Sequence, residues 1–200
     1  MDYNIDMTIN NQGFTLIELV LTLAVVSIVL LTGIPSLNKM TESNRFVTQI
    51  NSISGSLALA RSEAIKSGTT VTICASSNGT SCNVTTWHSG WIVFTDVDKD
   101  TVVDAGVDNL IQIQGALNGG GTLTLTLNGN AGVFQFLADG SSRGGKMGTF
   151  TLCPANGSTS EKEAKAKAVN INLIGRNSRA QGATPTETPV HDAAGNDISC

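Results

Sequence analysis

One carboxylate, that of Glu18, lies inside an apolar run that covers residues 14–37. About 20 apolar residues, at roughly 1.5 Å each in a helix, cross the hydrocarbon core of a bilayer, so this run is long enough to span a membrane. A carboxylate at that depth costs about 3 kcal/mol. Because such a cost persists only where something offsets it, we predict that Glu18 is functional and that an opposite charge is its partner.

Five aspartates crowd a short stretch in which Lys99 is the one basic residue: Asp96, Asp98, Asp100, Asp104 and Asp108. The first four resemble the start of a calcium loop, because hard cations need several oxygen ligands from a tight turn. However, Thr101 stands where an EF-hand loop has glycine, and Val107 where it has the bidentate glutamate. Two interpretations follow: a Ca²⁺ site at Asp96, Asp98, Asp100 and Asp104, or an exposed acidic hairpin loop, which the sequence favours.

Residues 140–144 formally fit the nucleophile elbow Gly-x-Ser-x-Gly of hydrolases. The elbow needs a helix directly after the serine, and the glycine-rich residues 144–148 do not favour one. His88 and His191 are the two histidines, and neither lies in a recognisable partner motif. We therefore expect no enzymatic activity and no cofactor.

Four cysteines follow the apolar run: Cys74, Cys82, Cys153 and Cys200. Their spacings lack the paired Cys-x-x-Cys form of zinc sites, whereas an even number in a translocated domain indicates two disulfides in an oxidising compartment. Three pairings are possible. We favour Cys74 with Cys82, across a short loop, and Cys153 with Cys200, a longer loop whose closure contributes roughly 4 kcal/mol.

The chain has 200 residues, 40% of them hydrophobic, and a formal net charge of -4. One membrane segment and one soluble domain of roughly 130 residues account for this length, and a domain of that size buries a core unaided. The acidic total argues against a chain built as a whole for nucleic acid. Between Arg143 and Arg179, however, seven basic residues face only Glu161 and Glu163, so the carboxy-terminal third is basic.

A helix is predicted over residues 14–67. Beyond Pro35, apolar residues recur at steps of four and three, as on one face of an amphipathic helix: Phe46, Ile50, Ile53, Leu57, Ala60 and Ala64. Gly68 supplies a stop. We expect residues 14–37 to be transmembrane and residues 38–68 to be an amphipathic continuation, with a kink or local unwinding at Pro35.

Seven segments after Gly68 read as strands: 70–75, 91–95, 110–114, 122–127, 133–137, 149–153 and 169–174. Gly- and Asn-rich connectors between them predict antiparallel hairpins. Residues 161–168 read as a solvated turn of helix, and residues 180–200 as an irregular tail. The predicted fold is α+β: a long N-terminal helix packed on the mostly antiparallel sheet of a head that covers residues 69–179.

The string Gly13-Phe14-Thr15-Leu16-Ile17-Glu18 resembles the amino-terminal signature of type IV pilins and pseudopilins. The resemblance implies a leader of residues 1–13, cut after Gly13 by a prepilin peptidase that methylates the new terminus at Phe14. It also implies assembly through Leu16, Ile17 and Leu19, with Glu18 paired to the terminal amine of a neighbouring subunit. The leader has no Lys or Arg, which departs from the family's usual pattern.

Three internal motifs narrow the resemblance: Ala-Arg-Ser-Glu-Ala-Ile at 60–65, Gly-Trp-Ile-Val-Phe at 90–94 and Gly-Thr-Phe-Thr-Leu-Cys at 148–153. They are similar to the FimT/GspH branch of minor pilins and pseudopilins. This implies a single-pass inner-membrane subunit, with its head in the periplasm, of a type II secretion pseudopilus or a type IV pilus. Its partners would be other pilins or pseudopilins, the prepilin peptidase and the inner membrane.

FimT-type members of this branch bind DNA through a Gly-Arg-x-Arg element, and residues 175–179, Gly-Arg-Asn-Ser-Arg, are similar but one residue longer. In an extended strand this spacing sends the two arginines to opposite faces, unless the chain turns at residues 177–178. The implied alternative function is a DNA receptor for natural transformation, which would hold phosphates with Arg176, Arg179, Arg143, Lys146, Lys162, Lys165 and Lys167. Other interpretations are a solvated basic face and, for the whole chain, a surface adhesin outside any filament.

Overall fold

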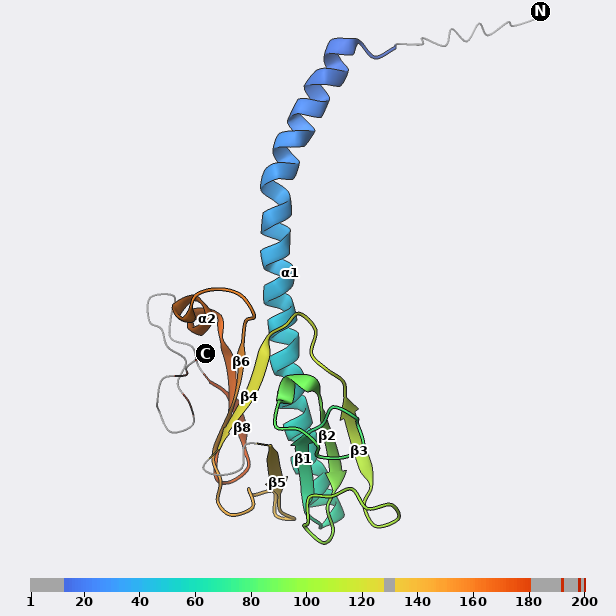
Figure 1. Ribbon diagram of the computed structural model, residues 1–200, viewed down its shortest axis with the longest axis vertical. Coiled ribbons are helices and arrows are strands. Elements are labelled where there is room, and N and C mark those ends of the chain that lie inside the picture. Colours follow the sequence, from blue (N-terminus) through green and yellow to red (C-terminus); the bar gives the residue numbers. More distant parts are fainter. Residues whose placement is uncertain (1–12, 128–131, 181–191, 193–197, 199) are drawn as a thin grey trace, which may run out of the picture. The chain divides into compact units, whose positions relative to one another are not determined.

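The computed structural model describes residues 13–127, 132–180, 192, 198 and 200, so most of the predicted leader (1–13) and irregular tail (180–200) lie outside the described residues. The chain divides into two compact units, Met1–Asn44 and Arg45–Cys200, and each is described by itself. α1 (Leu16–Ser67) contributes to both. The second unit (Figure 1) also contains β1 (Val71–Ala75), η1 (Trp87–Ser89), β2 (Trp91–Thr95), β3 (Leu110–Gln114), β4 (Thr122–Leu127), β5 (Val133–Phe136), β6 (Gly148–Cys153), α2 (Thr159–Lys165), β7 (Lys167–Ile171) and β8 (Asn177–Arg179).

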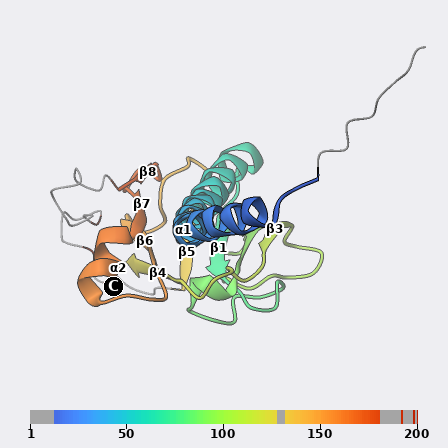
Figure 2. The same ribbon diagram turned by 90° about the horizontal axis from the view of Figure 1, so that it is seen from above.

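The second unit contains two four-stranded antiparallel sheets. The strand order is β3-β2-β1-β5 in the first sheet and β4-β6-β7-β8 in the second. Figure 1 and Figure 2 show both sheets beside the carboxy-terminal half of α1. The predicted α+β fold, a long helix packed on antiparallel strands, is therefore confirmed. The division of the strands between two sheets was not predicted.

The apolar stripe predicted on the second half of α1 is buried. Its six side chains are each at most 6% exposed: Phe46, Ile50, Ile53, Leu57, Ala60 and Ala64. They share one core with Ile73 and Phe134 of the first sheet and with Phe150 and Val169 of the second. Because both sheets pack on the same stripe, α1 forms the common centre of this core.

The segment after β6 differs from its prediction. The helix covers Thr159–Lys165 and not residues 161–168, and β7 covers Lys167–Ile171 and not residues 169–174. The helix begins earlier because Ser158 and Glu161 form a capping box, in which each side chain accepts a hydrogen bond from the other's backbone N–H. The strand ends earlier because the chain turns at residues 172–175, where the Gly175 N–H donates to the Asn172 carbonyl oxygen (2.9 Å).

Two disulfides join strands of the sheets to connecting segments. Cys74 in β1 is bonded to Cys82, with the Cα atoms 5.5 Å apart, and Cys153 at the end of β6 is bonded to Cys200, with the Cα atoms 5.9 Å apart. These are the two pairings that the sequence favoured. The second bond fastens the last residue of the chain to the second sheet.

α1 is helical without interruption from Leu16 to Ser67, through Gly33 and Pro35. Of the two predicted alternatives, a kink or local unwinding, the helix is therefore not unwound at Pro35. A proline removes one intrahelical hydrogen bond, and the bonds on either side keep the helix continuous. A kink at Pro35 stays a prediction.

Arg61 on α1 connects two turns that are distant in sequence. Its Nε donates to the Gly140 carbonyl oxygen (2.9 Å), and its Nη2 donates to the Ile174 carbonyl oxygen (3.1 Å). At Gly175, φ is +72°, and a Cβ atom there would lie 2.0 Å from the Gly140 carbonyl oxygen, so the two turns can meet only if this residue is glycine. A single guanidinium thus holds the helix, the turn after β5 and the turn after β7 together.

We expect Arg61→Ala to lower the free energy of unfolding by about 2 kcal/mol, because hydrogen bonds from a charged donor contribute roughly 1.5–3 kcal/mol and two carbonyls lose their partner. Urea unfolding of the purified, oxidised protein measures this change. Lys66→Ala is the matched control: it removes the same charge from the same helix, and Lys66 is 76% exposed in an ion pair with Glu63. A surface pair of this kind should change stability by less than about 1 kcal/mol, and equal effects of the two substitutions would contradict the prediction.

Candidate functional site

The amino-terminal part of α1 presents apolar side chains that nothing in its own unit covers. The exposed fraction is 79% for Phe14, 81% for Leu16, 73% for Ile17 and 55% for Leu19. The large hydrophobic residues that follow, as far as Leu31, are all more than half exposed. An exposed apolar surface of this extent marks a site of association with protein or lipid.

Glu18 lies in the first turn of this segment. Its backbone N–H donates to Thr15 Oγ1 (3.4 Å), so Thr15 caps the start of α1. The hydroxyls of Thr22 and Ser27 donate to the carbonyls of Leu19 (2.8 Å) and Leu23 (2.7 Å), so both hydroxyl donors are satisfied within the helix. Among the described residues, no hydrogen bond or ion pair reaches the Glu18 carboxylate, which is therefore available to another molecule.

No helix in the part of the chain that the structure describes is long and apolar enough to cross a membrane. The transmembrane role of residues 14–37 stays a prediction.

The acidic loop, residues 96–108 between β2 and β3, brings its carboxylates together in two groups. Carboxylate oxygens of Asp96, Asp98 and Asp100 lie within 4.8 Å of one another, and so do those of Asp98, Asp104 and Asp108. All four aspartates of the predicted calcium site therefore lie in this cluster, and Asp98 belongs to both groups.

Asp108 closes the acidic loop and was not part of the predicted site. Its Oδ1 accepts from the Val97 N–H (3.1 Å) and its Oδ2 from the Asp104 N–H (3.0 Å), so one carboxylate joins both ends of the loop. Burial and the carboxylates of Asp100, Asp98, Asp108 and Asp96 raise the pKa of Asp104 above its ordinary value. The only sequence signal for Asp108 is its place in the acidic run, which offers no reason to prefer it over its neighbours.

Asp96 is fully buried and is held by the first sheet. Its Oδ2 accepts hydrogen bonds from the hydroxyl of Thr72 in β1 and from Gln135 Nε2 in β5 (2.8 Å). Gln135 is itself oriented by Arg143, whose Nη1 donates to Gln135 Oε1 (3.0 Å) and to the Lys99 carbonyl oxygen (3.0 Å). Thr72 and Gln135 lie 24 and 39 residues from Asp96, and sequence reasoning missed both.

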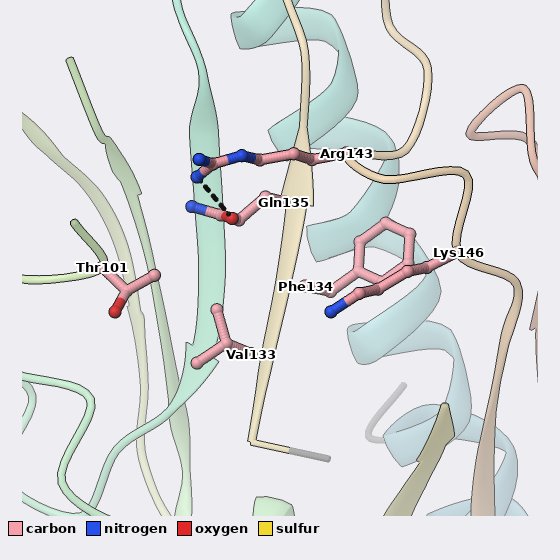
Figure 3. Close-up of a pocket in the computed structure, with 6 residues that line it drawn as sticks. All are labelled: Thr101, Val133, Phe134, Gln135, Arg143 and Lys146. Atoms are coloured by element: carbon pink, nitrogen blue, oxygen red, sulfur yellow. Dashed lines mark hydrogen bonds between the residues drawn. The ribbon is translucent and has the colours of Figure 1, made fainter. Parts of the chain in front are cut away.

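Figure 3 shows this corner of the head, with Arg143 reaching over Gln135. A small pocket of about 130 Å³ lies here, lined by Thr101, Val133, Phe134, Gln135, Arg143 and Lys146. Two of the seven cations predicted to bind DNA line it. The guanidinium of Arg143 is engaged in holding the acidic loop against β5.

The sequence allowed a turn at residues 177–178, between Arg176 and Arg179. The structure has no turn at these two residues. Residues 177–179 form β8, and the turn precedes them at residues 172–175. Asn177 Nδ2 donates to the Ser54 carbonyl oxygen (3.0 Å) and Arg179 donates to Asn51 Oδ1, so alternate residues of this edge strand face α1. Arg176 is exposed at the turn.

The remaining cations of that set lie elsewhere. Lys162 and Lys165 are on α2, and Lys167 is the exposed first residue of β7. α2 lies near one end of the second sheet (Figure 1), whereas Arg143 is hydrogen-bonded to Gln135 of β5 in the first sheet. The set is therefore spread over three places on the head.

The serine of the elbow-like segment is paired within its own turn. Ser141 Oγ donates to Asp139 Oδ1 (2.6 Å), and the hydrogen bonds from Ser141 lower the pKa of Asp139. Because Asp139 precedes Ser141 by two residues, this contact shapes a tight turn after β5.

Comparisons with known proteins agree with this architecture. Residues 49–175 match the family model of the type II transport protein GspH, and residues 9–34 match the prokaryotic N-terminal methylation motif. No curated protein matches the chain.

Two solved structures are similar to the chain. The type IV minor pilin FimU of Pseudomonas aeruginosa (strain PAO1) is 19% identical, with a TM-score of 0.52, over 75% of this chain and 96% of FimU. The minor pseudopilin EpsH from the type 2 secretion system of Vibrio cholerae is 16% identical, with a TM-score of 0.48, over 72% of this chain and 99% of EpsH. The similarity to FimU is one of fold.

A glycine in place of Thr101 should stabilise the acidic loop. Thr101 has a φ of +70°, a left-handed conformation that costs an L-residue roughly 1–2 kcal/mol and a β-branched one most of all. We expect Thr101→Gly to raise the free energy of unfolding by about 0.5–1 kcal/mol after the entropy of glycine is subtracted. Gly106→Ala is the reciprocal control, since φ there is +86° in open space and the substitution should destabilise. Urea unfolding in EDTA compares the two, and the same sign of change for both would refute the interpretation.

Proposed function

This chain belongs to the family of the type II transport protein GspH, and from that membership we propose how it acts as a minor pilin or pseudopilin. The precursor is cut after Gly13 by a prepilin peptidase, which methylates the new amino terminus at Phe14. The mature chain is held in the inner membrane by residues 14–37, with its head in the periplasm. From there it is assembled into a filament with other pilins or pseudopilins.

The observation that carries this proposal is the exposure of the whole apolar segment that begins at Phe14. Burying one Leu, Ile, Val or Phe side chain contributes roughly 1.5–3 kcal/mol, so a run of such residues is strongly driven out of water. Lipid covers it in the single subunit, and helices of neighbouring subunits cover it in the filament. The match of residues 9–34 to the N-terminal methylation motif supports the same assignment.

Glu18 supplies the specificity of assembly. Apolar helices slide past one another at little cost, because each register buries a similar area. A carboxylate in the first turn, with no partner among the described residues of its own chain, gains most where it meets an opposite charge in a low dielectric. The α-amine that cleavage releases on Phe14 of a neighbouring subunit is such a charge, and pairing with it sets the axial register.

The machine that contains the subunit is either a type II secretion pseudopilus or a type IV pilus. The family model is that of a type II transport protein, and the fold is shared with a type IV minor pilin. Both machines use the same mechanism of assembly in this proposal. Family and fold are those of structural pilins, so assembly and not catalysis is the proposed role.

DNA binding is the second candidate, and no contact among the described residues of the head favours it over assembly. Arg143 and Arg179 donate hydrogen bonds to groups of their own chain, and the seven cations lie in three places. A salt-sensitive shift of duplex DNA by the full chain, lost in Arg176→Ala with Arg179→Ala, is the result that would support this function.

We expect Glu18→Ala to leave cleavage and membrane insertion intact but to reduce incorporation into filaments at least about tenfold. Removing one partner of a desolvated ion pair costs roughly 3–5 kcal/mol, since the other charge is left unpaired. The amount of subunit in sheared filaments, relative to the total in membranes, measures the effect. Glu42→Ala removes an acid from the same helix beyond the apolar segment and should assemble normally. Normal incorporation of Glu18→Ala would refute the proposed pairing.

Gly13→Ser should leave the precursor uncut, because a side chain is added at the residue that precedes the proposed cleavage bond. Intact-mass measurement of the membrane-bound protein distinguishes a full precursor from a chain that begins at a methylated Phe14. Gly33→Ser, which adds the same side chain within the helix, is the control and should be cleaved. A mature-sized product from Gly13→Ser would contradict the assignment of the site.

A further inference from the structure

The acidic loop contains a buried carboxyl group, that of Asp96, which forms no ion pair with any described residue of the head. Asp96 is 0% exposed, and its Oδ1 atom has no hydrogen-bond partner among the described residues. The ion pair in the described part of the chain joins Lys66 to Glu63 and does not involve Asp96. A buried carboxylate is strongly destabilising unless it is paired or coordinates a metal ion. A merely solvated acidic loop, the interpretation favoured by the sequence, would leave every carboxylate in water.

We propose that the acidic loop binds one Ca²⁺ ion through carboxylate oxygens of Asp96, Asp98 and Asp100. Asp104, which lies in the second group with Asp98, is a further ligand. The oxygens of the first three residues already converge to within 4.8 Å of one another, and Asp98 links them to the group that contains Asp104. Three to four negative charges at this spacing repel one another, and a divalent cation removes that repulsion.

The first sheet positions Asp96 for this role. Thr72 and Gln135 both donate to Oδ2, so that oxygen is fixed and Oδ1 is left for the ion. Metal-binding carboxylates are characteristically oriented in this way by hydrogen bonds to their second oxygen. Gln135 in turn is held by Arg143, whose Nη1 is directed at an amide oxygen and a backbone carbonyl and not at the carboxylates. The cation of Arg143 therefore does not replace the bound ion.

The acidic loop adopts a tight turn although it lacks the glycine and the glutamate of the EF-hand pattern. Thr101 stands where that pattern has glycine, and its φ of +70° is nevertheless left-handed. Val107 stands where the pattern has glutamate, and the adjacent Asp108 brings the far end of the loop back by accepting from Val97 and Asp104. The chain thus turns tightly enough to gather its oxygens without either of the usual residues.

The donor set selects the metal. All the candidate ligands are oxygens, and the four cysteines are bonded in disulfides, which excludes thiolate coordination. Ca²⁺ accepts six to eight oxygens in irregular geometry, whereas Mg²⁺ requires a near-ideal octahedron and retains its water. We therefore expect Ca²⁺ to bind more tightly than Mg²⁺, with a Kd of about 10⁻⁴ to 10⁻³ M, as in extracellular modules.

The test uses the full, oxidised chain in detergent after treatment with EDTA and its removal. Titration calorimetry with CaCl2 should give a saturable isotherm for one ion per chain, and thermal unfolding should shift to higher temperature in Ca²⁺. MgCl2 and NaCl at the same ionic strength should have much smaller effects. Asp98→Asn should weaken Ca²⁺ binding at least about tenfold, because it removes the ligand common to both groups.

Glu163→Gln is the matched control, since it removes one negative charge from α2 and leaves the acidic loop unchanged. It should bind Ca²⁺ as the wild type does. The proposal is overturned if no saturable binding occurs up to about 10 mM Ca²⁺, well above the expected range. It is also overturned if Mg²⁺ acts as strongly as Ca²⁺, or if Asp98→Asn and Glu163→Gln bind equally. The result is independent of filament assembly, because each measurement is made on the isolated subunit.

Discussion

The fold of the head depends on one apolar stripe of α1 that two separate sheets must share. Ile53, Leu57 and Ala60 are at most 1% exposed and belong to a core that includes side chains of both sheets. Within the described part of the chain, neither sheet has another helix of comparable length to cover its inner face. Arg61 and Asn177 make polar contacts beside this stripe.

The two parts of α1 therefore differ in whether their apolar side chains are covered. From Phe46 onward its apolar face is closed by the head, whereas from Phe14 to Leu31 its apolar side chains remain exposed. A helix that is apolar on all sides is stable only in lipid or among other helices, and a helix with one apolar stripe is suited to a globular domain. In the proposed function, anchoring, assembly and display of the head are roles of successive parts of this one helix.

The polar sites of the head are built across long sequence distances. Arg61 holds carbonyls 79 and 113 residues away, and Asp96 is oriented by residues in two strands that precede and follow it. In both cases a charged group is placed where hydrogen bonds fix its direction. For Arg61, two carbonyl oxygens accept hydrogen bonds from the guanidinium, which links the helix to two turns. For Asp96 the buried Oδ1 has no hydrogen-bond partner among the described residues. A bound cation would satisfy this atom, whereas the exposed Asp98 has no such need.

By itself, the sequence determined the long helix, its buried stripe, most of the strands and the exposed acid of the apolar segment, because all of these follow from local period and composition. The sequence also favoured Cys74 with Cys82 and Cys153 with Cys200, because the spacing of the cysteines sets the length of each closed loop. Tertiary structure decided the rest: the division into two sheets, the edge strand β8, the partners of Arg61 and the burial of Asp96. Those features depend on which distant backbone and side-chain groups meet once α1 is covered, and no local pattern around residues 96 or 177 contains that information.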